Sequence, residues 1–261
     1  MTKLFNTIIV GPIHSRRLGS SLGINLLPQY GKLCNFDCIY CECGWNADGR
    51  SDTKIPSVEQ VESALEHRLK ELVAEGLKVD SITYSGNGEP TLHPQFSEIV
   101  DVTVKLRNRY SPNAVISLLS NATRIEKPKI KEALKKIDNP ILKIDSPIES
   151  YFKLLNNPSK GISLEKIITA LADLKGHFIL QTMFLKGFIE KDGEQIPIDC
   201  TEKENVAAWQ SLVRDLSPKS VMMYSIDRET PAKELSKVSV EQMREIAAPL
   251  VQEGFDINIA G

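Results

Sequence analysis

The sequence predicts an α/β protein built on a parallel sheet, in which six strand–helix units form a barrel that is left open. Two observations carry this prediction. Runs of β-branched and apolar residues recur at strand length, and the segments between them have apolar residues three or four positions apart, as on one face of a helix. Alternation of strands and helices along nearly the whole chain is typical of parallel strands joined by right-handed crossovers.

The expected elements cover most of the chain. Strands are expected at residues 22–27, 79–85, 114–120, 141–145, 178–184 and 220–224. Helices are expected at residues 58–74, 96–109, 125–135, 164–175, 206–216 and 240–252. Ser57 is a suitable N-cap for the first of these helices. A doubly wound sheet alternates in the same way, so the positions of the motifs must decide between it and a partial barrel.

Composition and charge are those of an ordinary soluble globular protein, and we expect one domain over residues 1–261. Of the 261 residues 41% are hydrophobic and 25% charged, and the formal net charge of -2 creates no overall basic field for nucleic acid. The first ten residues hold too short an apolar run for a secretory signal or a membrane span. We therefore expect a cytoplasmic protein with no membrane partner.

The polar stretch at residues 190–204 is expected to form a long loop. Such a loop lies either near the active site or at a tolerated surface insertion, and the sequence favours neither.

The cysteines are the most informative residues of the chain. Four of the five lie within ten residues, and Cys34, Cys38 and Cys41 have the spacing CxxxCxxC in a loop expected over residues 31–44. Clustered cysteines of a cytosolic protein more often bind metal than form disulfides. A 4Fe–4S cluster usually takes four thiolates, so three would leave one iron open to a chelating ligand.

Two alternatives to such a cluster remain. A closed zinc site could add Cys43 as its fourth ligand, although structural zinc usually draws its ligands from separated pairs. Unligated cysteines that behave as small buried hydrophobes are the other alternative.

Polar or glycine-rich segments follow the second and third expected strands. Residues 86–90 read Gly-Asn-Gly-Glu-Pro, which is either an ordinary turn or a place where the backbone closely approaches a ligand. Ser120 and Asn121 end the third expected strand, where they suit a turn or helix cap and a ligand contact about equally well.

Two charged side chains share one face of the fourth expected strand. The two-residue period of a strand puts Lys143 and Asp145 on the same side, away from Leu142 and Ile144. Buried ionisable residues rarely occur unpaired, so the two form either an internal ion pair or part of the site. They are our candidates for catalytic residues.

Further pocket candidates come from the ends of other expected elements. Gln181 in the fifth strand and Tyr224 in the sixth are placed where parallel barrels have their active sites. His14, Arg16 and Arg17 precede the first strand and are candidates for substrate binding, because paired arginines bind carboxylate or phosphate; surface salt bridges are the alternative.

The cysteine loop, with Tyr40 directly before its last cysteine, resembles the signature of radical S-adenosylmethionine (SAM) enzymes, and the Gly-Asn-Gly-Glu-Pro segment resembles the glycine-rich motif that ends their second strand. The resemblance implies a partial (β/α)6 TIM-like barrel, a 4Fe–4S cluster on Cys34, Cys38 and Cys41, and SAM chelating the open iron. Reductive cleavage of SAM would give methionine and a 5'-deoxyadenosyl radical that abstracts hydrogen from the substrate. The SAM-binding residues that it implies are Tyr40, Gly86, Asn87, Gly88, Glu89, Ser120, Asn121, Gln181 and Tyr224.

Similarity over most of the chain extends to a subgroup of Fe–S oxidoreductases related to the wyosine synthases, which modify a tRNA base. It is carried by residues 11–28 and by the segments CNFDCIYC, YSGNGEPTLHP, LSNAT and LKIDS. Wyosine synthases hold a second cluster on additional N-terminal cysteines, and this chain has no cysteine before Cys34, so we expect one cluster only.

Four candidate functions follow. The favoured class is a radical SAM enzyme that acts on a small molecule or a modified base, reduced by a donor such as flavodoxin or ferredoxin. An activase for a glycyl radical enzyme and a tRNA-modifying enzyme are the alternatives within the superfamily. A non-catalytic zinc or Fe–S binding module agrees with the cysteines alone but not with the glycine-rich motif.

Overall fold

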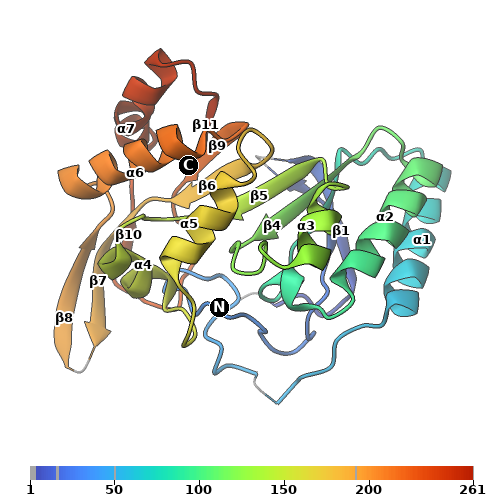
Figure 1. Cartoon of the computed structure of the whole chain (residues 1–261). Helices are drawn as coiled ribbons and strands as arrows, with labels where there is room; N and C mark the ends of the chain where they lie inside the picture. Colours follow the sequence, from blue (N-terminus) through green and yellow to red (C-terminus); the bar gives the residue numbers. More distant parts are fainter. Residues whose placement is uncertain (1–3, 16–17, 50, 192, 261) are drawn as a thin grey trace. The chain divides into compact units, whose positions relative to one another are not determined.

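The computed structural model describes residues 4–15, 18–49, 51–191 and 193–260 (Figure 1). The chain divides into two compact units. The N-terminal unit consists of Leu4–Asn35 and Asn46–Ile141, and the C-terminal unit of Phe36–Trp45 and Leu142–Gly261. The chain passes from one unit to the other inside the cysteine loop, between Asn35 and Phe36. The expectation of a single domain stays a prediction.

The N-terminal unit contains the first four strands in the order β1 (Ile9–Ser15), β2 (Gly19–Ile24), β3 (Ser81–Tyr84) and β4 (Val115–Ser120). Strand β1 is antiparallel to β2, while β2, β3 and β4 are parallel to one another. All four residues of β3 are buried, and the hydroxyl groups of Ser81 and Thr83 are hydrogen-bonded at 2.9 Å, so this polar content of the core is satisfied.

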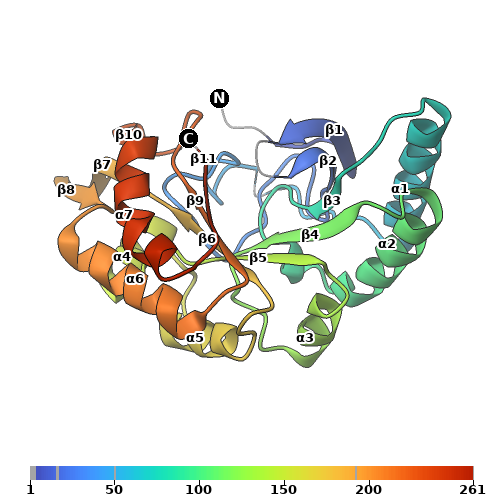
Figure 2. The same ribbon diagram turned by 90° about the horizontal axis from the view of Figure 1, so that it is seen from above.

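Three helices cover this part of the sheet. They are α1 (Val58–Ala74), α2 (Phe96–Tyr110) and α3 (Pro128–Leu134), and a 3-10 turn, η1 (Pro90–Leu92), precedes α2. Figure 2 shows the three helices on the same side of β3 and β4. Ser57 is the N-cap of α1, as expected. Its side chain accepts from the Gln60 amide while the Gln60 side chain accepts from the Ser57 amide, which is a complete capping box.

The C-terminal unit also contains parallel strands. The boundary between the units falls within strand β5 (Asn139–Lys143), after Ile141. The strand order of this unit then runs β6 (Ile179–Met183), β9 (Ser220–Tyr224) and β11 (Ile257–Ala260). The pairs β6–β9 and β9–β11 are parallel. The helices of this unit are α4 (Glu149–Asn156), α5 (Leu164–Ala172), α6 (Lys203–Leu216) and α7 (Val240–Gln252).

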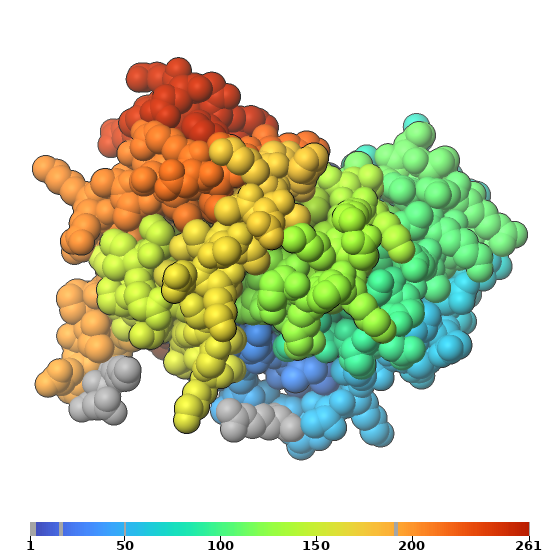
Figure 3. Space-filling view, in the orientation of Figure 1, coloured from blue at the N-terminus to red at the C-terminus, as the bar shows by residue number. Residues whose placement is uncertain are grey.

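A separate antiparallel sheet of β10 (Leu235–Lys237), β7 (Leu185–Lys191) and β8 (Glu194–Asp199) belongs to the same unit. Residues 190–204 are therefore not the long loop that we expected, because they complete the β7–β8 hairpin and begin α6. The hairpin is held by its own backbone pairing from Lys186–Asp199 to Lys191–Glu194, and this pairing does not require the apolar pattern of a core strand. Figure 3 shows the hairpin, in orange, next to α4 on one face of the unit.

The six expected strands all exist, as β2, β3, β4, β5, β6 and β9, with bounds shifted by up to three residues. The sequence analysis missed the short helix α4 and the strands β1, β7, β8, β10 and β11. Strand β1 is antiparallel and carries a register shift between Val10 and Ile13, which breaks the alternation on which strand prediction depends. No helix of the described residues is long and apolar enough to cross a membrane.

Candidate functional site

The first cysteine of the loop lies in the N-terminal unit beside Asn121. The Asn121 side-chain amide is 3.7 Å from the Cys34 Sγ and donates to the Asn35 side-chain oxygen at 2.7 Å. The Asn121 oxygen accepts from the Thr123 amide at 3.1 Å, so the amide group has one orientation. The Cys34 carbonyl accepts from the Asn46 side chain at 3.1 Å. Cys34 is thus held with an N–H donor near its sulfur.

The glycine-rich segment binds the chain that leads into Cys34. The Leu33 amide donates to the Asn87 carbonyl at 2.9 Å, and the Glu89 amide donates to the Leu33 carbonyl at 3.0 Å. A Cβ atom on Gly86 would stand 2.2 Å from the Asn25 side-chain oxygen. In this segment the glycines therefore permit a close approach to the protein's own chain.

The Asn87 side chain points into the N-terminal unit. It is fully buried, donates to the carbonyls of Phe5 and Pro28 at 2.9 and 2.7 Å, and accepts from the Phe5 amide at 2.8 Å. The Asn87 side chain thus links the glycine-rich segment to the backbone at Phe5 and at Pro28. These hydrogen bonds lie within the protein, and the contact of Asn87 with SAM that the sequence analysis expects stays a prediction.

Glu89 joins the ends of β3 and β4. One carboxylate oxygen accepts from the Thr91 amide at 3.1 Å, the Thr91 hydroxyl at 2.6 Å and the Ser120 hydroxyl at 2.8 Å, while the other accepts from the Asn121 amide at 2.7 Å. Burial raises the pKa of Glu89, and these hydrogen bonds oppose the rise only in part. The carboxylate therefore fixes the backbone that presents Asn121 to Cys34.

The second cysteine lies in the C-terminal unit between two nitrogen donors. The Lys143 ammonium is 3.4 Å from the Cys38 Sγ, and the Asn156 side-chain amide is 3.5 Å from the same atom. Burial raises the pKa of the Cys38 thiol, and the nearby Lys143 charge lowers it by less. Cys41 follows in a tight turn, because its amide donates to the Cys38 carbonyl at 3.1 Å.

Tyr40 and Asp145 complete the buried cluster around Cys38. The Tyr40 hydroxyl donates to the Asp145 carboxylate and accepts from the Lys143 ammonium, and the Lys143 Nζ is 3.3 Å from Asp145. Asn156 donates to Asp145 at 2.7 Å, and the Met183 amide donates to the other Asp145 oxygen at 3.0 Å. Lys143 and Asp145 thus form an internal ion pair, and their catalytic role stays a prediction.

The electrostatics of this cluster keep Lys143 charged. Burial lowers the pKa of Lys143, but Asp145, Cys38 and Tyr224 outweigh burial and the net pKa is raised. Burial and Asp145 together hold the pKa of Tyr40 well above its usual value, so the phenol stays protonated. A buried charge is tolerated here because it is both paired and hydrogen-bonded.

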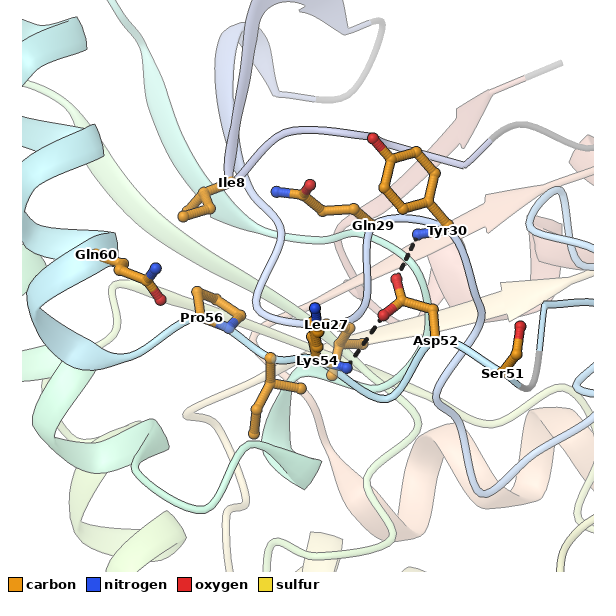
Figure 4. A pocket seen from close by; sticks show the side chains of 10 residues that line it. Ile8, Leu27, Gln29, Tyr30, Ser51, Asp52, Lys54, Pro56 and Gln60 are labelled. Atoms are coloured by element: carbon orange, nitrogen blue, oxygen red, sulfur yellow. Dashed lines mark hydrogen bonds between the residues drawn. The ribbon is translucent and has the colours of Figure 1, made fainter.

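Two of the larger pockets belong to different units. A pocket of about 470 Å³ in the N-terminal unit is lined partly by Gln29, Tyr30 and Asp52 (Figure 4). The acid of this pocket already has partners, because Asp52 accepts hydrogen bonds from the amides of Tyr30 and Lys54 at 2.8 and 3.1 Å, the two dashed lines in Figure 4. These bonds lower the pKa of Asp52.

The other pocket, of about 740 Å³, lies in the C-terminal unit between α4 and the β7–β8 hairpin. Ile39, from between Cys38 and Cys41, lines it together with the aromatic side chains of Trp45 and Phe188. Its volume is in the range of small-molecule sites.

Comparison with known proteins decides what the cysteine loop belongs to. The profile of the Radical SAM superfamily matches residues 29–196, which is more than half of the chain and includes the whole CxxxCxxC motif. The chain belongs to the radical SAM superfamily. It is therefore a radical SAM enzyme, and membership implies an iron–sulfur cluster and SAM as cofactors.

Its curated relatives include proteins without a descriptive name. A UPF0026 protein of Methanocaldococcus jannaschii is 29% identical over 93% of this chain and 70% of that protein, and a UPF0026 protein of Helicobacter pylori is 32% identical over 72% and 59%. A GTPase Obg of Brachyspira hyodysenteriae is 25% identical over 93% of this chain and 33% of that protein. The chain thus spans between 33% and 70% of the length of these relatives.

Solved radical SAM structures share the fold. The radical SAM methyltransferase of Sphaerobacter thermophilus superposes with a TM-score of 0.66 at 15% identity, over 92% of this chain and 65% of that one. Streptococcus suis SuiB bound to SAM superposes with a TM-score of 0.63 at 13% identity, over 92% of this chain and 50% of SuiB. TYW1 with a lysine-pyruvate adduct superposes with a TM-score of 0.61 at 14% identity, over 90% of this chain and 75% of TYW1. The predicted α/β fold of the radical SAM type is confirmed.

The cysteine surroundings in this radical SAM enzyme fit thiolate ligands. Side-chain N–H donors lie within 3.7 Å of the sulfur of Cys34 and within 3.5 Å of that of Cys38, and N–H donors stabilise thiolates more than thiols. Among the described residues, no three histidine, cysteine, aspartate or glutamate side chains form a group suited to a single metal ion.

The remaining candidates are spread over other parts of the radical SAM fold. Gln181 is buried in β6, and its carbonyl accepts from the Ile144 amide at 3.1 Å; Tyr224 ends β9 and is partly exposed. His14 is exposed on β1. Arg16 and Arg17 lie outside the described residues.

Sequence reasoning missed Asn156, which contacts Cys38, Tyr40 and Asp145 from the end of α4. One signal was present. Asn157 has the left-handed conformation in which asparagine often ends a helix, with φ of 39°, and a helix ending there would have placed Asn156 in its last turn.

Proposed function

We propose that this radical SAM enzyme binds a 4Fe–4S cluster through Cys34, Cys38 and Cys41 and acts on a small molecule or a modified base. When bound, the reduced cluster would supply the electron that cleaves SAM into methionine and the 5'-deoxyadenosyl radical that abstracts hydrogen from the substrate. A low-potential donor such as flavodoxin or ferredoxin would provide the electron. The protein would contribute the turn between Cys38 and Cys41 and the side-chain N–H groups that face the sulfurs of Cys34 and Cys38, which together would hold the cluster ligands in place.

The observation that carries the proposal is the pair of asparagine amides at two of the three cysteines. Asn121 and Asn156 come from different units and lie far apart in sequence, yet each places its amide nitrogen within 3.7 Å of a motif sulfur. Burial raises the pKa of the Cys38 thiol, and a bound metal ion would stabilise its thiolate form. Cysteines packed only as hydrophobes would not need these donors.

The glycine-rich segment limits which of its groups can contact SAM. The side chains of Asn87 and Glu89 are occupied by hydrogen bonds within the protein. We propose that this segment meets SAM through its backbone, while Ser120, Asn121, Gln181 and Tyr224 remain the side-chain candidates from the strand ends.

The proposed substrate class is supported by two features. The 740 Å³ pocket beside Ile39 has room for a substrate with a planar ring, and Trp45 and Phe188 offer aromatic surfaces for stacking. TYW1, whose structure holds a lysine-pyruvate adduct, shares the fold, and the segments quoted above resemble the wyosine-synthase-related subgroup. Modification of a tRNA base is therefore the second candidate.

Cluster loading and SAM cleavage test the proposal together. After anaerobic reconstitution we expect iron and sulfide in the protein with broad visible absorption, and 5'-deoxyadenosine after addition of dithionite and SAM. Cys38→Ala should lose both properties, whereas Cys43→Ala, which changes a cysteine outside the motif, should keep them. Continued SAM cleavage by a variant in which Cys34, Cys38 and Cys41 are all alanine would refute the proposal.

A further inference from the structure

Lys143 reaches the sulfur of a cluster cysteine rather than open space. Its side chain is only 12% exposed, and its ammonium group lies 3.4 Å from the Cys38 Sγ. The same group also lies 4.9 Å from the centre of the Tyr40 ring and donates to the Tyr40 hydroxyl. The contacts of Lys143 are therefore directed at residues of the cysteine loop.

Asp145 holds this ammonium in place from the other side. Its side chain has no exposed surface, and it accepts from Tyr40, Asn156 and the Met183 amide. The Lys143 ammonium therefore contacts the Cys38 sulfur directly, whereas the Asp145 carboxylate contacts Tyr40 and Asn156, which lie around that sulfur. Consistent with this order, Lys143 lowers the pKa of the Cys38 thiol by more than Asp145 raises it.

We propose that Lys143 is a positioning residue that raises the reduction potential of the cluster by acting on Cys38, and that Asp145 limits this rise. The inference rests on the proposed function, since it requires Cys38 to be a cluster ligand. Lys143 and Asp145 thereby act on a ligand of the cluster and not on the substrate.

The physical reason is the charge that reduction adds. One electron passes from a low-potential donor into the cluster, no bond is broken, and the cluster becomes more negative by one charge. A cation or an N–H donor at a ligand sulfur stabilises the more negative state, and an anion nearby destabilises it. In a buried site with little water these interactions are screened less than at the surface.

The two charges therefore predict shifts of opposite sign. Lys143→Met should make the potential more negative, with the equilibrium constant for reduction falling at least tenfold, which is about 59 mV for one electron. Asp145→Asn should make the potential less negative. Both would be measured without SAM in a redox titration followed by electron paramagnetic resonance, on reconstituted protein whose iron and sulfide contents match those of the wild type.

Two further variants keep the test informative if Lys143→Met folds poorly with Asp145 left unpaired. The double variant Lys143→Met with Asp145→Asn removes both charges, and its potential should lie between those of Lys143→Met and the wild type. Lys143→Arg keeps the charge and should shift the potential by less than half as much. Lys166→Met removes an exposed lysine of α5 and should leave the potential unchanged.

Shifts of the same sign in Lys143→Met and Asp145→Asn, or no shift in either, would overturn the inference while the proposed function stands. A wild-type protein that takes up no cluster would instead refute the proposed function. A loss of cluster content alone, with unchanged potential in the remaining clusters, would show that Lys143 has a structural role only, which also contradicts the inference.

Discussion

Gly88 lies against Leu33 so closely that a Cβ atom on Gly88 would stand 1.9 Å from the Leu33 carbonyl oxygen. The φ angle of Gly88 is +135°, a conformation that residues with a side chain rarely adopt. Leu33 directly precedes Cys34, so this contact fixes the chain at the point where the cysteine motif begins.

We expect Gly88→Ala to destabilise the protein and to reduce cluster loading. A strained φ costs about 1–3 kcal/mol, and displacement of Leu33 adds to this cost. Gly76→Ala is the matched control, because Gly76 also has a positive φ, of +69°, with no described atom within 4 Å of the added Cβ. Urea midpoints would compare them, and equal losses of stability in both variants would show that the Leu33 contact contributes nothing.

Asn87→Ala should lower stability rather than act on SAM alone. The substitution removes the Asn87 donor from the buried Pro28 carbonyl and leaves the partly buried Phe5 carbonyl with only the Asn25 side-chain amide at 3.3 Å, at a cost of roughly 3 kcal/mol. Asn108→Ala, an exposed change on α2, should stay within about 0.5 kcal/mol of the wild type. Weaker SAM binding by an Asn87→Ala protein of wild-type stability would support the original expectation of a ligand contact.

His93 makes stability depend on pH. Its Nδ1 accepts from the Gln95 amide at 3.2 Å, so its Nε2 donates to the Pro56 carbonyl at 2.9 Å, and this arrangement requires the neutral ring. Burial lowers the pKa of His93 below 6.5. Because the unfolded chain binds the proton more readily, the stabilisation is present above pH 6.5 and is lost as the pH falls through the folded-state pKa.

Urea unfolding between pH 7.5 and 5 would measure this loss. The wild type should lose at most about 1.4 kcal/mol per pH unit from this residue, and His93→Gln should lack that contribution. His67→Gln, a change at an exposed position of α1, should behave as the wild type does. Identical pH dependence in the His93→Gln and wild-type proteins would mean that His93 is not held neutral.

Cys200 should be unreactive in the folded protein. It is fully buried, and burial raises the pKa of its thiol to about 12. At pH 8 its thiolate fraction is roughly a thousand-fold smaller than that of a thiol with the usual pKa of 9.0. Iodoacetamide labelling of metal-free protein, followed by mass spectrometry, should modify the partly exposed Cys43 and leave Cys200 unmodified until denaturant is added. Early labelling of Cys200 would contradict its burial.

Features that depend on neighbouring residues could be predicted from the sequence. The N-cap position of Ser57 and the shared face of Lys143 and Asp145 follow from local sequence, and both are present in the structure. The six expected strands were also found from local patterns of apolar residues.

Features that depend on distant partners could not be predicted. The β7–β8 hairpin is held by backbone pairing between polar strands, and Asn156 reaches Cys38 across 118 residues of sequence. No local pattern distinguishes an asparagine that faces a sulfur from one that ends a helix, because the two differ only in what the fold brings close to it.

The sequence alone determined that three cysteines share one short loop, that an aromatic residue stands before the last of them, and that strands alternate with helices. These properties are local, and the superfamily match agrees with them. Only the tertiary structure showed that the side chains of Asn87 and Glu89 make hydrogen bonds within the protein, and that Lys143 contacts Cys38. Hydrogen bonds and charges act over a few ångströms, and folding alone decides which side chains come within that distance.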